Sequence, residues 1–599
     1  MLYYEGAEQY QAIIVEFENK IGRFIEMLFE NSTIQANDTR SKVINDPVWG
    51  SINFNRYEIK LLDSPLLQRL RDINQVGMAS LTYPSARHSR FEHSLGVFHV
   101  ASEMVKNINS RNGDSLISDR EHKMIRLAAL LHDIGHCYGS HLSERIYGNL
   151  EQMHDIKEHP LFIKAKPHEI FAYFMINSLY FQNFFRNLNS GIENIDDYFF
   201  DSLGRMIVGY PVEETDSKTN KTVYKHFMSS IINGDFDADK LDYIRRDTYF
   251  GGLFLNYDIE RFLYRIDIHE EDYSKASHKY LVISLTGVTA IEEMAFCRIM
   301  LTSYIYFHQK VLAADAIMND FGLALINDEI VRHPCDFLIY TDSKLSLASF
   351  LGKSISTETK RTYGDILKDL ENRILPKRAL VIKTMYLDVA SAKETEYDKN
   401  YNTFRGIIED ISKGNSALQE AYMKVKNTIE LTIKEKQVDL TDLADTEQGN
   451  IKEQIRKTYT IREGIYYIAQ KILNEVRIKH YATTKNIKAF DKYDIYISFR
   501  DEPTFSSNDI NIFDSNNKPL SLDSIMPLEP WTKAFAANKW SGYIFTRDDL
   551  VPLINIAARE YFSREYHFVF LEEFKYAYLK ASEIKVAKDI ENIIRNSTI

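Results

Sequence analysis

The feature that most constrains this chain is an apolar segment that ends in a histidine and an aspartate. Residues 126–136 read RLAALLHDIGH, in which the apolar run Leu127–Leu131 precedes His132 and Asp133. Burying an imidazole and a carboxylate side by side at the end of a core helix is costly unless a ligand satisfies both groups. A divalent metal ion satisfies both, so the segment predicts a buried helix that ends at a metal centre.

Two other segments supply candidate ligands at helical spacing. In residues 87–105, His93 lies on the apolar stripe of an expected helix. In residues 233–247, Asp239 and Tyr243 lie one helical turn apart and share a face. The simpler interpretation of a lone His-Asp pair is the capped end of a core helix. The additional candidate ligands on apolar faces favour a metal site instead. The expected metal site consists of His93, His132, Asp133 and Asp239. These residue types suit Mn, Fe, Co, Ni or Zn and do not separate them.

Four longer motifs of the chain resemble a single family. They are QRLRDINQVG (68–77), SRFEHSLGV (89–97), LLHDIGH (130–136) and DADKLDYIRRD (237–247). In this order they resemble the HD-type deoxynucleoside triphosphate triphosphohydrolases (dNTPases), which include the vertebrate sterile-alpha-motif/HD dNTPase and bacterial dNTPases. The resemblance covers residues 41–312, with weaker similarity to 385. It implies a mainly α fold, with an HD-domain helical core and a smaller C-terminal α+β region.

Length and composition agree with such an architecture. The chain has 599 residues and is 44% apolar, which is enough for a large core with an appended domain. We expect an N-terminal helical extension over residues 1–40, an HD-type dNTP triphosphohydrolase domain over 41–390 and a C-terminal α+β region over 391–599.

Charge and cysteine content narrow the expected surroundings of the protein. A net charge of -12 gives no general attraction to nucleic acid, because a phosphate backbone would be repelled. The three cysteines form no CxxC pair, as in a reducing compartment. No run approaches the roughly 18 apolar residues of a membrane span, and the N-terminus lacks a signal pattern. We expect a soluble, cytoplasmic protein.

Local patterns predict further elements. We expect helices over 10–29, 65–76, 288–315, 337–352, 363–382, 424–437, 548–564 and 573–594. We expect strands over 279–286 and 493–499, the second half-buried, a hairpin or loop over 212–226, and a loop over 149–166 that closes over the site.

Several side chains near the His-Asp pair are candidates for catalysis. A second layer of imidazoles beside a metal can neutralise phosphate charge or deliver a proton to a leaving oxygen. The resemblance implies that His136, His141 and His168 surround the α-phosphate, with His141 as the proton donor. Glu144 stands where many relatives have an aspartate that orients a catalytic histidine, and its extra methylene changes that geometry.

The resemblance implies a substrate site of Gln75, Arg90, Lys240, Tyr243, Asp247, Arg298 and Tyr306. Its basic members would hold phosphates, Gln75 would contact the sugar, and Tyr243 would contact the nucleotide. Asp247 would accept the 3′-hydroxyl, which gives strong selection because a missing partner leaves a buried acceptor unpaired. Tyr306 would stack on the sugar and exclude a ribose 2′-hydroxyl. Without the resemblance, these residues would be surface polar groups or packing residues.

The resemblance also implies a regulatory nucleotide site of Lys42, Val43, Asn45, Asp63, Gln68, Arg71 and Lys310. Basic residues beside hydrogen-bond acceptors are what a phosphate plus a guanine-like edge requires. An ordinary turn with solvated charges is the alternative. A regulatory site built between subunits predicts a homo-oligomer, either a tetramer or a hexamer.

The function implied is metal-dependent hydrolysis of dNTPs to deoxynucleoside and inorganic triphosphate, with Mg on the nucleotide phosphates. By the habits of the family, removal of dNTPs would serve antiviral defence against phage or pool balance. The alternatives are an HD-type phosphodiesterase or nuclease, a nucleoside monophosphate phosphohydrolase, and a regulatory protein that binds nucleotides without turnover.

Overall fold

The computed structural model describes most of the chain as two compact units. The described residues are 7–30, 41–112, 116–188, 192, 194–216, 220–355, 360–383, 387–388, 461–479, 487–500, 511–514, 519–520, 525–526, 530–531, 539, 541–566 and 568–595. Of the described residues, the first unit comprises those within 1–311, 322–349 and 504–532, and the second those within 312–321, 350–503 and 533–599. The helix expected over 424–437 lies outside the described residues.

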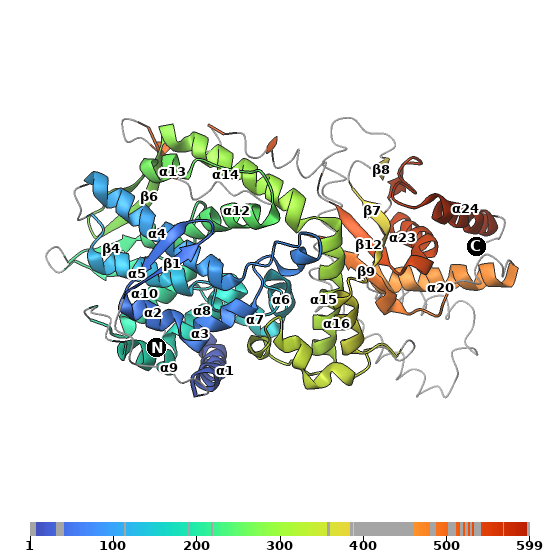
Figure 1. Ribbon diagram of the computed structural model, residues 1–599, viewed down its shortest axis with the longest axis horizontal. Helices are drawn as coiled ribbons and strands as arrows, with labels where there is room; N and C mark the ends of the chain where they lie inside the picture. The colour runs from blue at the N-terminus through green and yellow to red at the C-terminus, as the bar shows by residue number, and fades with distance from the viewer. Residues whose placement is uncertain are drawn as a thin grey trace. The chain divides into compact units, whose positions relative to one another are not determined.

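The first unit is mainly helical (Figure 1). Its helices are α1 (Gln11–Glu30), α2 (Arg56–Leu62), α3 (Pro65–Gln68), α4 (Arg90–Asn112), α5 (Asp119–Leu131), α6 (His141–Tyr147), α7 (Glu151–Lys157), α8 (Pro167–Asn177), α9 (Leu179–Arg186), α10 (Asp197–Ile207), α11 (His226–Ile232), α12 (Ala238–Gly251), α13 (Ile259–Arg265) and α14 (Val288–Leu301). Helix α4 packs against α5 and α12, and α8 packs against α10. The apolar stripe of α4 predicted from sequence is buried, including Val97, Val100 and Met104.

Two sheets flank these helices. The hairpin of β1 (Lys42–Asp46) and β2 (Gly50–Phe54) is antiparallel, and Gly50 has a positive φ that favours glycine in its turn. The larger sheet has the order β11-β10-β6-β4-β3, with β5 paired to β6. Its strands are β3 (Val212–Thr215), β4 (Thr222–Lys225), β5 (Ile266–Asp272), β6 (Ala276–Ser284), β10 (Asn511–Phe513) and β11 (Pro519–Leu520). The predicted hairpin at 212–226 and the predicted strand at 279–286 are therefore confirmed.

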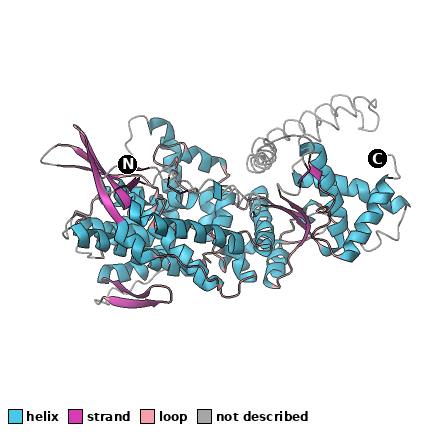
Figure 2. Ribbon diagram, turned by 90° about the horizontal axis from the view of Figure 1, so that it is seen from above, coloured by secondary structure: helices cyan, strands magenta, loops and turns pink. Residues whose placement is uncertain are grey.

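The second unit combines helices with a small antiparallel sheet, drawn as magenta strands among cyan helices in Figure 2. Strands β7 (Lys377–Ile382), β12 (Gly542–Thr546) and β9 (Ile495–Ser498) pair in the order β7-β12-β9. Strands β8 (Leu387–Asp388) and β13 (Val569–Phe570) form a second pair. Its helices are α16 (Tyr363–Glu371), α20 (Ile461–Lys479), α23 (Val551–Tyr566) and α24 (Ala581–Arg595), and α23 packs on α20 and α24. Helix α15 (Gln309–Asn327) contributes residues to both units.

The structure confirms a mainly α fold with a smaller α+β region. The predicted helix at 10–29 corresponds to α1. The domain boundaries at residues 40 and 390 stay predictions.

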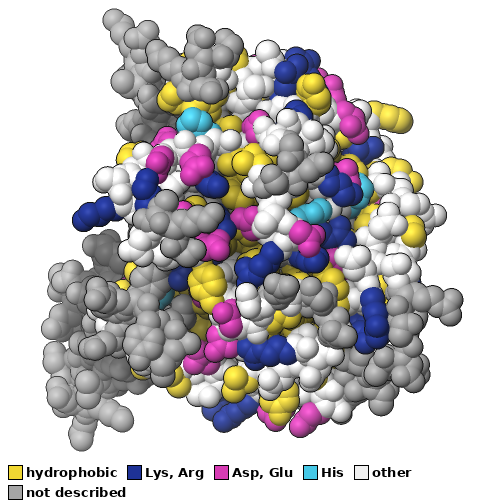
Figure 3. All heavy atoms as spheres, turned by 90° about the vertical axis from the view of Figure 1, so that its left-hand side faces the viewer, with side chains coloured by type: hydrophobic (Ala, Val, Ile, Leu, Met, Phe, Trp, Pro, Cys, Tyr) yellow, Lys and Arg dark blue, Asp and Glu magenta, His cyan; other side chains and the backbone are white. Residues whose placement is uncertain are grey.

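Among the described residues, no helix combines the length and the apolarity that crossing a bilayer requires. On the face drawn in Figure 3, basic, acidic and apolar side chains are interspersed.

The predicted helix at 65–76 is wrong beyond its first turns. Helix α3 ends at Gln68, a 3₁₀ turn spans Arg69–Asp72, and Ile73 is extended. The backbone of residues 73–75 instead forms hydrogen bonds with residues 88–90, such as Arg90 N to Ile73 O at 2.8 Å. These long-range bonds replace the next helical turn. The apolar residues predicted to face the core are buried nevertheless; they are Leu66, Leu67, Leu70 and Ile73.

The predicted helix at 288–315 is interrupted. Helix α14 ends at Leu301, a π turn spans Thr302–Tyr306, and α15 begins after His308. The backbone of His308 is extended, and its ring nitrogen accepts a hydrogen bond from Lys310 N. This cap starts a second helix, and the π turn sets the direction of Tyr306.

Three other local predictions need correction. The loop expected at 149–166 contains α7, because Met153 and Ile156 are buried on one face of a short helix. The segment 337–352 forms 3₁₀ turns, in which Thr341 and Ser343 donate to Asp72. Helix α16 stops at Glu371, because Arg373 two residues later has a positive φ that a right-handed helix does not allow. Residues 377–382 form β7.

The C-terminal predictions are partly correct. Strand β9 lies within the predicted strand 493–499, but its neighbours Ile495 and Tyr496 are both buried, so both faces are covered and the strand is not half-buried. The predicted helix at 548–564 corresponds to α23 after a 3₁₀ turn. The predicted helix at 573–594 begins later, as α24 at Ala581.

Candidate metal centre and imidazole cluster

Three helices bring the predicted metal ligands to one place. Helix α5 starts at a capping box of Ser118 and Glu121, and it ends at Leu131, so that His132 and Asp133 occupy the following turn. His93 lies in the first turn of α4, and Asp239 in the first turn of α12. The turn after α5 needs Gly135, because a Cβ there would lie 2.0 Å from the backbone oxygen of His168.

The four predicted ligands converge. His93 Nε2 lies 2.9 Å from Asp239 Oδ1 and 3.6 Å from Asp133 Oδ2. His132 Nε2 lies 3.4 Å from Asp133 Oδ1 and 3.9 Å from Asp239 Oδ1. The side chains of His93, His132 and Asp133 are buried, and Asp239 is partly exposed. Two imidazole nitrogens and two carboxylates therefore face a common point.

The hydrogen bonds of the two histidines fit a divalent metal. His132 Nδ1 donates to the carbonyl oxygen of Ala129 at 2.8 Å, so its Nε2 carries the lone pair. This Nε2 is buried and has no hydrogen-bond partner in the described part of the chain. His93 Nδ1 donates to Asp242 Oδ2 at 2.6 Å. A carboxylate or carbonyl on Nδ1 is the usual outer support of a metal-ligating histidine.

Charge near His93 also favours a cation at this point. Burial alone would lower the pKa of His93, but hydrogen bonds to Asp239 and Asp242 raise that pKa to about 10. Burial alone would raise the pKa of Asp133, but Arg90 and His132 hold it well below its usual range. The site is therefore rich in ionised carboxylates, and a metal ion can replace the proton between His93 and Asp239.

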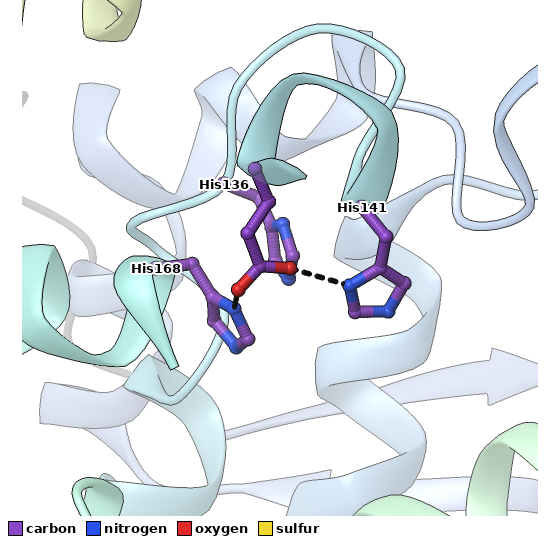
Figure 4. Close-up of side chains that lie close together, drawn as sticks. His136, His141 and His168 are labelled. Atoms are coloured by element: carbon purple, nitrogen blue, oxygen red, sulfur yellow. Dashed lines mark hydrogen bonds and ion pairs between the residues drawn. The ribbon is translucent and has the colours of Figure 1, made fainter. Parts of the chain in front are cut away.

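Beside the predicted metal ligands lies a cluster of imidazoles arranged around one carboxylate (Figure 4). Glu144 Oε2 accepts from His141 Nδ1 at 2.6 Å, and Glu144 Oε1 accepts from His168 Nδ1 at 2.7 Å. His136 stacks on His168 with ring centroids 3.8 Å apart. Asp133 Oδ1 lies 3.3 Å from His136 Nε2, so Asp133 faces both groups. The structure thus unites the four residues predicted for catalysis.

The two imidazoles bonded to Glu144 differ in environment. The side chain of His141 is 58% exposed, whereas that of His168 is 4% exposed. Burial alone would lower the pKa of His168, but Glu144 raises it. Burial alone would raise the pKa of Glu144, but the two histidines hold it well below its usual range. Glu144 is therefore an ionised carboxylate shared by two imidazoles.

Two predicted substrate residues have buried polar atoms that a ligand could use. Arg90 Nη1 donates to Asp133 Oδ2 at 2.7 Å, and Arg90 Nε donates to Ser140 Oγ at 3.0 Å. In the described part of the chain, Arg90 Nη2 and Gln75 Oε1 are buried without a hydrogen-bond partner. Unpaired buried polar atoms are costly, and a bound ligand would satisfy them.

The predicted sugar-binding residues form a second group. Tyr306 Oη donates to Asp247 Oδ2, and His88 Nε2 lies 2.7 Å from Asp247 Oδ1. Tyr243 and Tyr306 pack against the same buried apolar cluster. Asp247 is thus a buried acceptor between two partners, next to two tyrosine rings.

The two other basic residues predicted to hold phosphate are Lys240 and Arg298. Lys240 Nζ donates to Asp237 Oδ2 and to the carbonyl oxygen of Gly234, each at 2.7 Å. Arg298 lies on α14, near enough for its charge to act on the phenol of Tyr243. A phosphate contact by Lys240 would therefore require an exchange of partners.

Comparisons with known proteins agree with this geometry. The HD domain family model matches residues 90–193. The chain is 26% identical to the deoxynucleoside triphosphate triphosphohydrolase SAMHD1 homolog of Dictyostelium discoideum, over 67% of this chain and 70% of that protein. It is 30% identical to the SAMHD1 triphosphohydrolase of Bos taurus over 47% and 46%, and 28% identical to the uncharacterized protein YwfO of Bacillus subtilis over 57% and 71%. The chain therefore contains an HD domain and is similar to dNTPases of the HD-domain class over this part of its length.

The chain spans about half the length of the bovine relative. A crystal structure of a hypothetical protein from Aquifex aeolicus aligns with a TM-score of 0.51 and 20% identity, covering 87% of this chain and 100% of that chain, which shows the fold alone. The HD domain match contains His93, His132 and Asp133, whereas Asp239 lies beyond its end.

The residues that the family resemblance places at a regulatory site lie on separate segments. Lys42, Val43 and Asn45 are exposed on β1. Asp63 caps α2, and Gln68 donates to the carbonyl oxygen of Leu62 while it accepts from Arg71 Nε, both at 2.8 Å. Lys310 lies in the first turn of α15. Their joint use by a nucleotide stays a prediction.

Sequence reasoning missed two buried groups of this site. His88 is stacked on Phe250 and bonded to Asp247, and Asp242 is bonded to His93. For Asp242 a signal existed, since it follows Asp239 by three positions on one helix and therefore lies near the same face. For His88 the sequence offered only a histidine in an irregular segment.

Proposed function

We propose that this chain is a metal-dependent hydrolase that cleaves dNTPs to deoxynucleoside and inorganic triphosphate. The observation that carries the proposal is Asp133, which faces a set of metal ligands on one side and a histidine cluster on the other. The HD domain and this ligand set support a phosphohydrolase that takes a divalent metal. The triphosphohydrolase names of the Dictyostelium and bovine relatives support the choice of substrate.

The proposed metal is a divalent transition ion, such as Mn, Fe, Zn, Co or Ni, held by His93, His132, Asp133 and Asp239. When bound, such a metal supplies Lewis acidity, which polarises a phosphoryl oxygen and acidifies a water molecule. The orientation of both imidazoles by Ala129 and Asp242 supports this assignment.

The imidazole cluster would provide the acid. In the proposed reaction, water oxygen bonds to the α-phosphorus and the bond from that phosphorus to the 5′-oxygen breaks. The 5′-oxygen takes a proton from His141, whose exposure lets it meet substrate and whose Nδ1 is fixed by Glu144. His136 and His168 would lie against the α-phosphate, and the water proton would pass to solvent.

The remaining residues would bind the nucleotide. Arg90, through its free Nη2, would hold a phosphate together with Lys240 and Arg298. Gln75 would contact the sugar and Tyr243 the nucleoside, while Asp247 would accept the 3′-hydroxyl. Tyr306 would exclude the 2′-hydroxyl of a ribonucleotide. Mg²⁺ would accompany the phosphate tail as part of the substrate.

Regulation and biology complete the proposal. A second nucleotide would bind at Lys42, Val43, Asn45, Asp63, Gln68, Arg71 and Lys310, between subunits of a tetramer or hexamer. Depletion of dNTPs would then serve defence against phage or pool balance in a cytoplasmic setting. A protein that is fully active as a monomer in the presence of dNTPs would exclude the shared regulatory site.

The test is an analysis of products. Purified protein with Mn²⁺ and Mg²⁺ receives each dNTP and NTP singly and in mixtures, and chromatography resolves nucleosides, nucleotides and inorganic phosphates. Deoxynucleoside with triphosphate supports the proposal, and hydrolysis of one dNTP only in the presence of another supports the regulatory site. Mono- or diphosphate products, or no turnover in any mixture, would refute the triphosphohydrolase assignment in favour of a phosphodiesterase or a binding protein.

A further inference from the structure

The proposed metal ligand His93 is oriented through its Nδ1 atom by a buried chain of charged side chains, Asp242 and Arg246. His93 Nδ1 donates to Asp242 Oδ2, which also accepts from Arg246 Nε at 2.8 Å. Arg246 Nη2 donates to Asp242 Oδ1 at 3.0 Å. The side chains of all three residues are 0% exposed. The orientation of His93 therefore depends on where this pair of charges is fixed.

Helix α4 makes room for this arrangement. A Cβ at Gly96 would lie 1.8 Å from Asp242 Oδ1 and 2.4 Å from Arg246 Nη2. Gly96 follows His93 by one helical turn, and the Asp242 carboxylate and the Arg246 guanidinium lie against α4 at this glycine. Any side chain at this position would push the pair away from His93.

The far end of the chain of charges is anchored by the β1–β2 hairpin, which lies against α4. Arg246 Nη1 donates to Asp46 Oδ2 at 2.8 Å. The other oxygen of Asp46 accepts from the backbone nitrogens of Val48 and Trp49, each at 2.9 Å. Trp49 Nε1 in turn donates to Asp242 Oδ1. One turn of the hairpin thus contacts both members of the buried charge pair.

We propose that Asp46 and Trp49 are positioning residues for the metal ligand His93, acting through Asp242 and Arg246. Buried charges hold their places only while every partner is present, because an uncompensated group rearranges or is hydrated. Loss of either hairpin contact leaves Arg246 or Asp242 short of a partner. Asp242 then turns away from His93 Nδ1, and Nε2 no longer points at the metal.

The inference rests on the proposed metal centre, but not on the choice of substrate. It predicts that the stability of the hairpin and the affinity of the site for a metal ion are coupled. Coupling free energies are reciprocal. Metal binding must therefore stabilise the ordered hairpin by the same free energy by which the ordered hairpin strengthens metal binding. Both directions can be measured without substrate.

The experiment uses the full-length chain, stripped of metal with a chelator and titrated with Mn²⁺ alone. Asp46→Asn keeps the acceptor for the turn nitrogens but presents an amide to Arg246. Trp49→Phe keeps an aromatic ring beside His99 and Arg245 but removes the indole donor. The control is Glu58→Gln, which breaks a comparably buried ion pair with Arg126, whose Nη2 also donates to Asn53 O of the hairpin.

We expect each hairpin variant to weaken Mn²⁺ binding by about tenfold, the effect typical of outer-shell partners of a metal ligand. The Glu58→Gln protein should bind Mn²⁺ as the wild type does, even if its melting temperature falls. Hydrogen–deuterium exchange should show that Mn²⁺ slows exchange at the amides of Val48 and Trp49 in the wild type and much less in the variants.

Two outcomes would overturn the inference. Wild-type affinity in both hairpin variants, or an equal loss in the Glu58→Gln control, would show that the hairpin acts on stability alone. If the wild-type protein binds no Mn²⁺, the proposed metal centre itself is refuted. A protein that binds Mn²⁺ as expected but releases no triphosphate would refute the proposed activity and leave the positioning role intact.

Discussion

Replacement of Glu144 by glutamine gives the sharpest test of the imidazole cluster. Glu144 accepts hydrogen bonds from His141 Nδ1 and His168 Nδ1 at 2.6 and 2.7 Å. A glutamine offers one oxygen and one NH₂ group, so it can accept from only one of these nitrogens. A hydrogen bond to a charged group contributes about 1.5–3 kcal/mol, and each 1.36 kcal/mol is tenfold in rate.

If the lost bond is the one that orients the proton donor, kcat should therefore fall by about 10- to 150-fold. KM and the affinity for Mn²⁺ should change little, because neither Arg90, the proposed phosphate contact, nor the four proposed metal ligands are altered. The assay is release of triphosphate from dNTPs under saturating Mn²⁺, with metal content and melting temperature measured in parallel. Glu151→Gln, on the nearby helix α7, serves as the matched control.

A kcat within about threefold of wild type, with normal metal content, would refute the role of Glu144 as the group that orients His141. A parallel loss of metal would place the effect at the metal ligands instead. A fall in kcat with an unchanged control and unchanged metal content is the outcome that the geometry predicts.

Three further predictions concern other parts of the site. Asp133→Ala should abolish hydrolysis, with a loss of at least about 10³-fold, while calorimetry still detects dNTP binding; residual turnover near wild type would exclude the metal route. Tyr306→Ala should lower the preference for dNTP over NTP by about tenfold or more in competition assays, and an unchanged preference would show that another residue excludes the 2′-hydroxyl. Burial raises the pKa of Asp342 to about 6, against hydrogen bonds from Asn74 and Gly139. Since the folded state binds this proton more tightly than the unfolded state, the stabilisation is complete below about pH 4 and is lost as pH rises through 6. Urea unfolding between pH 4 and 7 should show that fall, and Asp342→Asn should flatten it; an equal slope in both proteins would contradict the assignment.

Much of the candidate metal site could be predicted because each proposed ligand lies in a locally interpretable pattern. His132 and Asp133 end an apolar helix, His93 lies on an apolar stripe, and Asp239 begins a helix. His93 and the His132-Asp133 pair occupy positions that periodicity assigns to the interior, and burial of such groups calls for a ligand. Asp239 is marked only by the helix face that it shares with Tyr243. The structure brings all four residues together.

The supports of these ligands could not be predicted in the same way. Asp46 and Arg246 are far apart in the sequence, and either alone is an ordinary surface charge by its local pattern. Their ion pair is buried only because the hairpin turn lies against α4 and α12. No periodicity encodes the pairing of two charges across separate elements.

The errors in secondary structure have the same origin. Residues 65–76 have helical periodicity throughout, yet Ile73 and Asn74 leave the helix to bond with residues 88–90 and with Asp342. Residues 288–315 read as one helix, yet a π turn interrupts it beside Tyr306. In both places, long-range hydrogen bonds and side-chain contacts at the site outweigh a local preference worth only tenths of a kcal/mol per residue.

By itself, the sequence determined the apolar faces of the helices, the polar residues placed among them and hence the class of site, because burial and periodicity act between near neighbours. Tertiary structure alone decided which nitrogen of each histidine faces the proposed metal position, which carboxylate fixes it and where helices end at the site. Those features depend on distances of a few ångströms between groups that folding brings together from distant parts of the chain, and no local pattern records them.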